Sequence, residues 1–205
     1  MPMVTNSLEL DMTELLGLVG RLNEIYAADG IKITVTDLFV KIIAIVMKRN
    51  RFAAVYLEDG KFRRLNSIDI GMAVASEYGL VVPVIRDVIH KDIKEINKDK
   101  LELIKKASEN KLSPDDFGEA CTTLTNVGNY KMEVFTPLIN YPESCIFGTA
   151  NIIKKPCVRD DEIVIRPIMW FNFTYDHRVM DGAQAATIIN ETREIIETPG
   201  LAIGL

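Results

Sequence analysis

The stretch that decides the fold is IMWFNFTYDHRVMDG, residues 168–182. Its first six residues are mostly apolar and predict a strand, and the residues from 183 onward have the pattern of a helix. The run therefore places His177, one of only two histidines in the chain, on a strand-to-helix turn. The backbone of such a histidine is anchored to the core, and its side chain can face a cleft. Imidazole is the side chain best suited to moving protons near neutral pH, so His177 is the first catalytic candidate.

Three further charged residues, Asp176, Arg178 and Asp181, crowd the same turn. Charges near a core are costly to bury unless they are paired, so we expect pairing to fix the geometry of the turn. The plain alternative is that His177 is a structural residue with satisfied hydrogen bonds. We expect no metal, because a zinc site needs three or four ligands and the other histidine, His90, lies in a basic loop with the pattern of an exposed surface.

The motifs of several other enzyme classes are missing. The sequence contains no Gly-x-Ser-x-Gly elbow, no Gly-x-Gly-x-x-Gly loop and no Walker-type loop. This argues against a serine hydrolase and against a nucleotide cofactor bound in those ways. We therefore expect His177 to act as a general base on a proton carried by the substrate. Thiols are the natural target, because a pKa of about 8.5 leaves only a small fraction ionised at pH 7.

A second segment of interest is TTLTNVG, residues 122–128. It brings three hydroxyls, an amide and a glycine to the end of a short predicted strand. One interpretation is a solvated strand that ends in an Asn-x-Gly turn. The functional interpretation is that one hydroxyl stabilises an oxyanion, a contribution of about 2.7–4 kcal/mol for a well-placed donor.

The bulk composition is that of a globular protein with a full core. Hydrophobic residues make up 48% of the 205 residues and charged residues 26%, with a net charge of −5. The acidic balance argues against a nucleic-acid surface. The longest apolar run, residues 42–47, is far shorter than a membrane span, and no signal peptide is evident. Three cysteines without metal-type spacing predict free thiols in a reducing compartment, the cytoplasm or an organelle matrix.

The order of predicted elements points to an α/β layered fold with a mixed sheet. A capping box at Asp11–Glu14 is expected to open the first helix, which Gly30 ends, and Thr36-Asp37 opens a second, buried helix. Pro83 predicts an edge strand or a bulge, and Pro167 is expected to interrupt a late strand. The remaining predicted elements are strands at 54–57, 62–65, 68–75, 79–86, 121–127, 144–153 and 162–175, a helix at 92–110 with Ile93, Ile96, Leu101, Ile104 and Ala107 on its apolar side, and a helix at 183–197.

The two candidate segments together resemble the catalytic domain of the dihydrolipoamide acyltransferases, the core component of 2-oxo acid dehydrogenase complexes. The family's Asp-His-Arg-x-x-Asp-Gly motif is matched by residues 176–182, and its Thr-x-Ser/Thr-Asn-x-Gly segment by residues 123–128. Further similar stretches are Phe135-Thr136-Pro137-Leu138-Ile139-Asn140 with Pro142, Gly79-Leu80-Val81-Val82-Pro83-Val84, and Glu9-Leu10-Asp11-Met12-Thr13. The match runs through nearly the whole chain in the right order, so residues 1–205 are expected to form one acyltransferase domain.

The resemblance implies a two-layer sandwich of the chloramphenicol acetyltransferase type, a mixed sheet covered by helices. It also implies acyl transfer between dihydrolipoamide and coenzyme A. His177 would take the proton from the attacking thiol, and Thr125 would donate its hydroxyl to the tetrahedral oxyanion. Asp181 would orient the site through a charge pair. Asn126, Gly128 and Arg178 would contact coenzyme A, which is a substrate, and no metal takes part.

The resemblance further implies a homotrimer whose sites lie between subunits, with the histidine from one chain and the hydroxyl from its neighbour. A cage of 24 or 60 subunits would use the apolar tail, residues 201–205. The lipoyl group and the other components of the complex are the expected partners, and neither nucleic acid nor a membrane is expected.

Three departures from the family pattern stand out. We expect the family's first helix to be missing before residue 2 and the chain to hold neither a lipoyl domain nor a subunit-binding domain. Thr125 stands where many members have serine. The β-branch of threonine fixes its rotamer more tightly than serine's. Two alternatives therefore stay open: a catalytically weak trimeric scaffold of the same fold, and an acyltransferase that uses a hydroxyl or amine acceptor.

Overall fold

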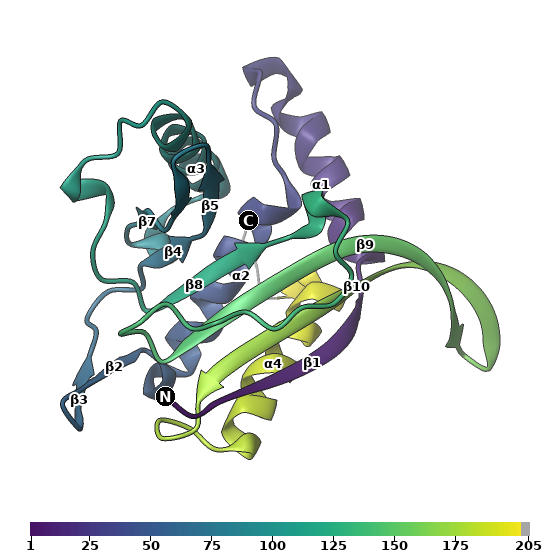
Figure 1. The fold of residues 1–205 in the computed structure, drawn as a ribbon. Coiled ribbons are helices and arrows are strands. Elements are labelled where there is room, and N and C mark those ends of the chain that lie inside the picture. Colours follow the sequence, from purple (N-terminus) through teal and green to yellow (C-terminus); the bar gives the residue numbers. More distant parts are fainter. Residues whose placement is uncertain (202–205) are drawn as a thin grey trace.

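The computed structural model describes residues 1–201, which build a mixed sheet with helices packed behind it (Figure 1). Six strands lie in the order β1-β10-β9-β8-β4-β7, and β8 runs parallel to both β4 and β9. Helices α1, α2 and α4 lie behind the sheet, and α3 lies beyond its β4–β7 end. This confirms the predicted α/β sandwich with a mixed, helix-covered sheet.

The elements follow the predicted order. The helices are α1 (Thr13–Tyr26), α2 (Val35–Arg49), α3 (Ile93–Ser108) and α4 (Gly182–Glu197). The strands are β1 (Met3–Asp11), β2 (Val55–Glu58), β3 (Lys61–Arg64), β4 (Ile70–Met72), β5 (Val74–Ser76), β6 (Gly79–Val81), β7 (Val84–Ile85), β8 (Thr122–Asn126), β9 (Cys145–Arg159) and β10 (Glu162–Asp176). Short 3-10 turns, among them η5 (Gly128–Tyr130), connect them.

Alternation along the central strands gives the sheet two unlike faces. Toward the helices it presents a ladder of aromatic rings, in which Phe171 stacks on Phe39 of α2 at 5.7 Å and on Phe147 at 5.8 Å between ring centroids. The ladder continues through Phe173 to Tyr175. These rings are almost fully buried and join α2 to the two central strands.

The opposite face is crossed by the segment that follows β8 (Figure 1). Phe135 and Pro137 of this segment press against Gly148 of β9, where an added Cβ would lie 2.7 Å from the Phe135 ring. Gly148 therefore permits the close approach of the segment to the sheet. Thr125 is paired with Gly148 in the sheet register, so the Thr125 side chain belongs to this second face.

The predicted strand pair at 68–75 and 79–86 is divided into two pairs. β4 joins β7 in the main sheet, whereas β5 and β6 form a separate hairpin. Pro83 lies between β6 and β7, and β7 is an edge strand, as the proline predicted. The Pro83 carbonyl still accepts a hydrogen bond from the Met72 N–H at 2.9 Å.

Three details of the helices differ from the predictions. The capping box at residues 11–14 is wrong: Met12 is the N-cap of α1, and Asp11 accepts hydrogen bonds from the Thr13 N–H and hydroxyl instead. On α3, Leu101 is 53% exposed and Ile104 is 39% exposed, because the helix turns Leu103 and Lys100 inward. The second helix begins at Val35, one residue before the predicted start, with a capping box between Thr34 and Asp37.

The late strands are longer than predicted. β9 and β10 form one extended antiparallel hairpin, and Pro167 does not interrupt it. Proline lacks only the N–H, and the Pro167 carbonyl remains available to accept from the Met12 N–H at 2.8 Å. Within residues 1–201 no helix is long and apolar enough to cross a membrane. The predicted cage-forming tail extends beyond the described residues.

The aromatic ladder yields a stability prediction. Phe171→Ala should lower the free energy of unfolding by about 3–5 kcal/mol, because it removes a buried ring that packs on two others. Urea unfolding at fixed protein concentration measures this. The matched control is Ile25→Ala on α1, where the side chain is 67% exposed and the expected change is within about 0.5 kcal/mol. Equal losses in the two variants would contradict a core organised around the ladder.

Candidate functional site

The turn after β10 is organised by an ion pair between neighbouring residues. Arg178 grips the buried Asp176 carboxylate through Nη2 to Oδ2 at 2.6 Å and Nε to Oδ1 at 3.0 Å. Burial alone would raise the pKa of Asp176, but the hydrogen bonds and charge of Arg178 outweigh it and hold the pKa below its usual value. The expected pairing of charges is therefore confirmed. The predicted coenzyme A contact Arg178 is engaged in this structural pair, with its side chain 49% exposed.

His177 projects from this turn with an exposed side chain. Its backbone N–H donates to the Pro2 carbonyl at 2.9 Å, which fixes the main chain, and its ring lies 5.9 Å from the Tyr175 ring. Within the described residues, no side-chain hydrogen bond engages the two imidazole nitrogens. The ring is thus held at its base and its nitrogens are available to a group outside this chain.

Asp181 caps the helix that follows the histidine turn. It is the N-cap of α4, where Oδ1 accepts from the Gln184 N–H at 2.9 Å. In the reciprocal bond, the Asp181 N–H donates to Oε1 of Gln184 at 3.0 Å. Among residues 1–201 it forms no ion pair, and its predicted charge pair stays a prediction. The capping box fixes the start of α4 directly after the histidine turn.

The second predicted segment lies at the end of β8. Asn126 forms the expected Asn-x-Gly turn, its Oδ1 accepting from the Gly128 N–H at 2.8 Å. The Nδ2 of Asn126 donates to the Thr36 hydroxyl at 3.3 Å, which ties β8 to the first turn of α2. Thr125 is half-buried between these anchored neighbours. The hydroxyl proposed as an oxyanion donor therefore stands on a rigid strand end.

The structure does not bring Thr125 and His177 together within one chain. Thr125 of β8 is paired with Gly148 of β9, which is paired with Asn172 of β10. His177 lies five residues beyond Asn172, roughly 16 Å along the strand direction, and two strands away. Proton transfer needs hydrogen-bond distance, so a single chain cannot use both groups on one substrate.

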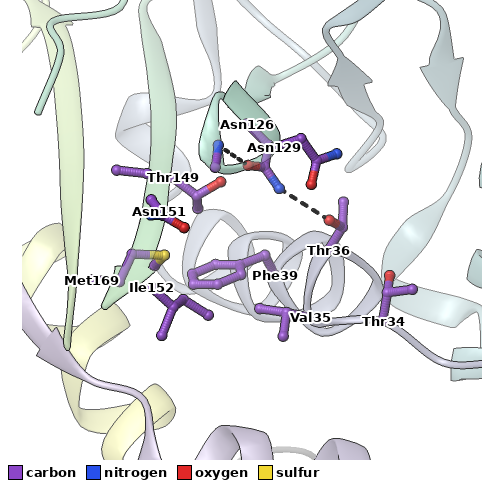
Figure 2. Close-up of a pocket in the computed structure, with 12 residues that line it drawn as sticks. Thr34, Val35, Thr36, Phe39, Asn126, Asn129, Thr149, Asn151, Ile152 and Met169 are labelled. Atoms are coloured by element: carbon purple, nitrogen blue, oxygen red, sulfur yellow. Dashed lines mark hydrogen bonds between the residues drawn. The ribbon is translucent and has the colours of Figure 1, made fainter. Parts of the chain in front are cut away.

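Two clefts meet at Asn126. One, of about 310 Å³, is floored by Phe39 and Met169 and ringed by polar side chains, among them Thr36, Asn129 and Asn151 (Figure 2). The other, of about 290 Å³, contains Thr125 and is mostly apolar. Thr36, Asn126 and Asn129 line both clefts. Asn126 and Gly128, predicted to contact coenzyme A, thus border a real recess, whereas the contributions of Thr36 and Asn129 carry no sequence signal.

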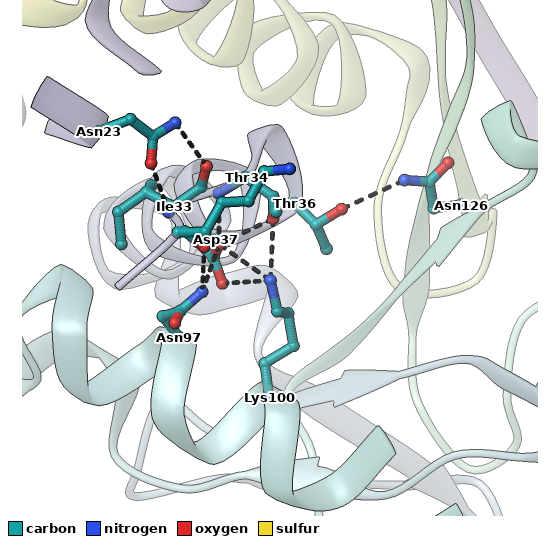
Figure 3. A network of polar contacts seen from close by, with 9 residues as sticks. Asn23, Ile33, Thr34, Thr36, Asp37, Asn97, Lys100 and Asn126 are labelled. Carbon is teal, nitrogen blue, oxygen red and sulfur yellow. Dashed lines mark hydrogen bonds and ion pairs between the residues drawn. The ribbon is translucent and has the colours of Figure 1, made fainter. Parts of the chain in front are cut away.

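A buried polar network supports the Thr36 side of the clefts (Figure 3). The Lys100 ammonium of α3 lies 2.8 Å from Oδ1 of Asp37, and Asn97 donates to Oδ2 at 3.0 Å. Asp37 also accepts from the N–H and hydroxyl of Thr34, both at 2.7 Å. Every donor converges on one fully buried carboxylate, so the network locks α3 to the N-terminus of α2.

Two of the three cysteines, Cys121 and Cys145, are not placed as nucleophiles. Cys121 and Cys145 are buried, and burial raises the pKa of the Cys145 thiol to about 12 and that of Cys121 well above its usual value. His90 is exposed and contacts Asp87 at 2.7 Å. Residues 1–201 hold no group of three or more His, Cys, Asp or Glu side chains that could bind a metal ion.

Glu143 is a buried carboxyl that the motif analysis did not single out. Its Oε1 accepts from the Thr123 hydroxyl at 2.7 Å and from Asn140 Nδ2 at 2.9 Å, and Oε2 has no partner within the described residues. Burial raises its pKa to about 8. Thr123 precedes Thr125 by two residues on the same face of β8. The only sequence signal was a carboxylate just before an apolar strand.

Substitutions of Asp181 can distinguish a capping role of this side chain from a catalytic role of its charge. Asp181→Ala should lower the stability of the chain by about 1 kcal/mol, whereas Asp181→Asn, which keeps the capping oxygen, should change it little. Thermal unfolding measures this. If Asp181 acts mainly as a cap, Asp181→Asn also keeps most of any catalytic rate that depends on His177. A large loss of rate with unchanged stability in Asp181→Asn would show that the charge itself is required.

Glu143 predicts a pH dependence of stability. The folded chain retains a proton that the unfolded chain releases near pH 4.5, so the stabilisation is complete below that pH and is lost as pH rises toward 8. The decline attributable to Glu143 should approach ~1.4 kcal/mol per pH unit within this window. Denaturation of the parent chain and Glu143→Gln at several pH values measures it. Parallel pH profiles for the two chains would contradict a buried neutral carboxyl.

Comparison with known proteins identifies the family of this chain. The sequence model of the family "2-oxoacid dehydrogenases acyltransferase (catalytic domain)" matches residues 1–203. The dihydrolipoyllysine-residue acetyltransferase component of the pyruvate dehydrogenase complex of Rickettsia bellii is 36% identical over 198 residues, which are 96% of this chain and 47% of that protein. The chain thus spans about half the length of the curated relatives it matches.

Solved structures agree. Dihydrolipoamide acetyltransferase of Azotobacter vinelandii superposes with a TM-score of 0.94 at 29% identity, covering 98% of this chain and 84% of that one; the catalytic roles of one serine, one histidine and one asparagine were investigated in it. The cubic core of the pyruvate dehydrogenase multienzyme complex superposes equally well, with a TM-score of 0.94 at 30% identity and the same coverage. Chloramphenicol acetyltransferase shares the fold, with a TM-score of 0.56 at 15% identity over 95% of this chain and 88% of that one. This chain belongs to the family of 2-oxoacid dehydrogenase acyltransferase catalytic domains.

Proposed function

We propose that this chain transfers an acyl group between coenzyme A and dihydrolipoamide as the catalytic core of a 2-oxo acid dehydrogenase complex. The observation that carries the proposal is a spacing. The serine, histidine and asparagine investigated in the Azotobacter vinelandii enzyme are separated along its chain by the same numbers of residues as Thr125, His177 and Asp181 are here. A hydroxyl and an imidazole thus occupy the two corresponding positions.

The reaction follows from these two groups. An imidazole nitrogen of His177 takes the proton of the attacking thiol, and the thiolate adds to the thioester carbonyl. Thr125 donates its hydroxyl hydrogen to the oxyanion that forms, where such a donor contributes about 2.7–4 kcal/mol. The intermediate then breaks its bond to the departing sulfur, which takes the proton back from His177. One carbon–sulfur bond forms and one breaks, and no covalent acyl-enzyme is required.

The active site is completed by a second copy of the chain. Thr125 and His177 lie too far apart in one copy, so His177 of one subunit serves Thr125 of another. The proposed unit is a homotrimer, and the likeness to a cubic core supports assembly into a larger cage. Asn126 and Gly128 border the coenzyme A site, and the lipoyl group comes from another domain or chain. A cytoplasmic or organelle-matrix location stays a prediction of the sequence.

Complementation between two inactive variants tests the whole proposal. His177→Ala should reduce transfer from acetyl-coenzyme A to dihydrolipoamide by at least a hundredfold, and Thr125→Val by about 10²–10³-fold. When the two variants are unfolded, mixed and refolded together, each mixed trimer should regain one intact site. Each variant refolded alone is the control, and mass measurement in the same buffer confirms the oligomer.

Two results would contradict the proposal. A mixture that forms oligomers and stays as inactive as its parents would place both groups in one chain. A parent chain that forms the trimer and transfers no acetyl, succinyl or isobutyryl group would instead be a scaffold of the same fold.

A further inference from the structure

Three exposed apolar side chains from separate elements converge on the cleft that holds Thr125. Leu80 of β6 is 71% exposed, Ile104 of α3 39% and Tyr130 of η5 65%, and all three line this cleft. Exposed apolar side chains gathered around one recess mark a binding site more often than chance exposure does. The fold does not require Ile104 to be apolar, since it faces away from the core.

The rotation of α3 explains why Ile104 faces the cleft. Asn97 and Lys100 lie on one stripe of the helix, and Ile104 continues that stripe one turn further along. Asn97 and Lys100 are fixed to Asp37 by the buried network (Figure 3). Thr36, the neighbour of Asp37, lines the same cleft as Ile104. The network therefore orients Ile104, the apolar residue at the end of this stripe, toward the cleft that contains Thr125.

Within one copy of the chain, the described side chains that line this cleft include no aspartate, glutamate, lysine, arginine or histidine. Its remaining lining side chains include Met72, Val74 and Val127. An uncompensated carboxylate in such a recess loses water without gaining a partner, which is strongly unfavourable. The adjoining cleft differs, since its amides and hydroxyls suit the amide-bearing arm of a carrier rather than its acyl end (Figure 2).

We infer that the Thr125 cleft receives the acyl end of the thioester and selects uncharged acyl groups, acetyl or short branched ones, over succinyl. Ile104 is a specificity-determining residue of this cleft. The inference rests on the proposed function, because it assigns the substrate class of that same transfer reaction. The chemistry is unchanged: the carbonyl carbon moves from one sulfur to the other, and only the group attached to it is selected.

A donor series tests the inference. With dihydrolipoamide as acceptor, kcat/KM for acetyl-coenzyme A and isobutyryl-coenzyme A should each exceed that for succinyl-coenzyme A by at least about tenfold. Ile104→Lys places a cation at the cleft edge and should narrow the acetyl-to-succinyl ratio by about fivefold or more. The matched control is Leu101→Lys, the same charge change one turn earlier on α3, where the side chain lines a separate hollow. Its ratio should equal that of the parent chain.

Failure of this inference differs from failure of the proposed function. Transfer of succinyl as fast as acetyl would overturn the inference while supporting the acyltransferase. Equal acetyl-to-succinyl ratios in Ile104→Lys and Leu101→Lys would show that Ile104 does not determine the specificity of the cleft. If no donor reacts, binding of acetyl- and succinyl-coenzyme A is compared by calorimetry: a preference for the acetyl form that Ile104→Lys reduces supports the inference, and equal affinities overturn it.

Discussion

The constraint on which the rest of this structure depends is the alternation of side chains across the central strands. A pleated strand sends neighbouring residues to opposite faces, so one face of β9 and β10 can be aromatic while the other carries Ile146, Gly148, Asn172 and Thr174. The aromatic face stacks on α2 and fixes the helical layer. The other face is left to the segment that crosses Gly148 and to the side chain of Thr125. Stability and chemistry thereby use opposite sides of the same strands.

For the proposed reaction, the same constraint makes assembly part of the chemistry. The strand register fixes Thr125 and His177 relative to each other, and no change of rotamer closes a separation of two strands and five residues. His177 is held through its backbone and leaves its ring exposed, as the proposed contact with a neighbouring subunit requires. The Asp176–Arg178 pair beneath it keeps the turn rigid without engaging the imidazole nitrogens within the described residues.

Much of this was predictable because the signals were local. The strand-to-helix turn at His177, the Asn-x-Gly turn and the edge strand marked by Pro83 depend on residues adjacent in sequence. Errors arose where tertiary contacts decide. The apolar spacing of α3 could not reveal that Lys100 is the inward residue, because its partner Asp37 comes from another helix. The cap at Asp181, by contrast, was a local signal that the motif analysis passed over, because Asp181 and Gln184 have the spacing of a capping box.

The buried Asp37–Lys100 pair determines the geometry of the helices more than it stabilises the fold. Replacing such a pair by apolar residues is often neutral or stabilising, so its net contribution to the free energy of unfolding is small. An apolar contact, however, tolerates rotation and sliding of a helix, whereas a carboxylate that accepts from Lys100, Asn97 and Thr34 has one satisfactory arrangement. That arrangement sets the rotation of α3 and holds Thr36 against Asn126. A charge pair buried outside the cleft thus determines which apolar residue of α3, Ile104, lines the same cleft as Thr125.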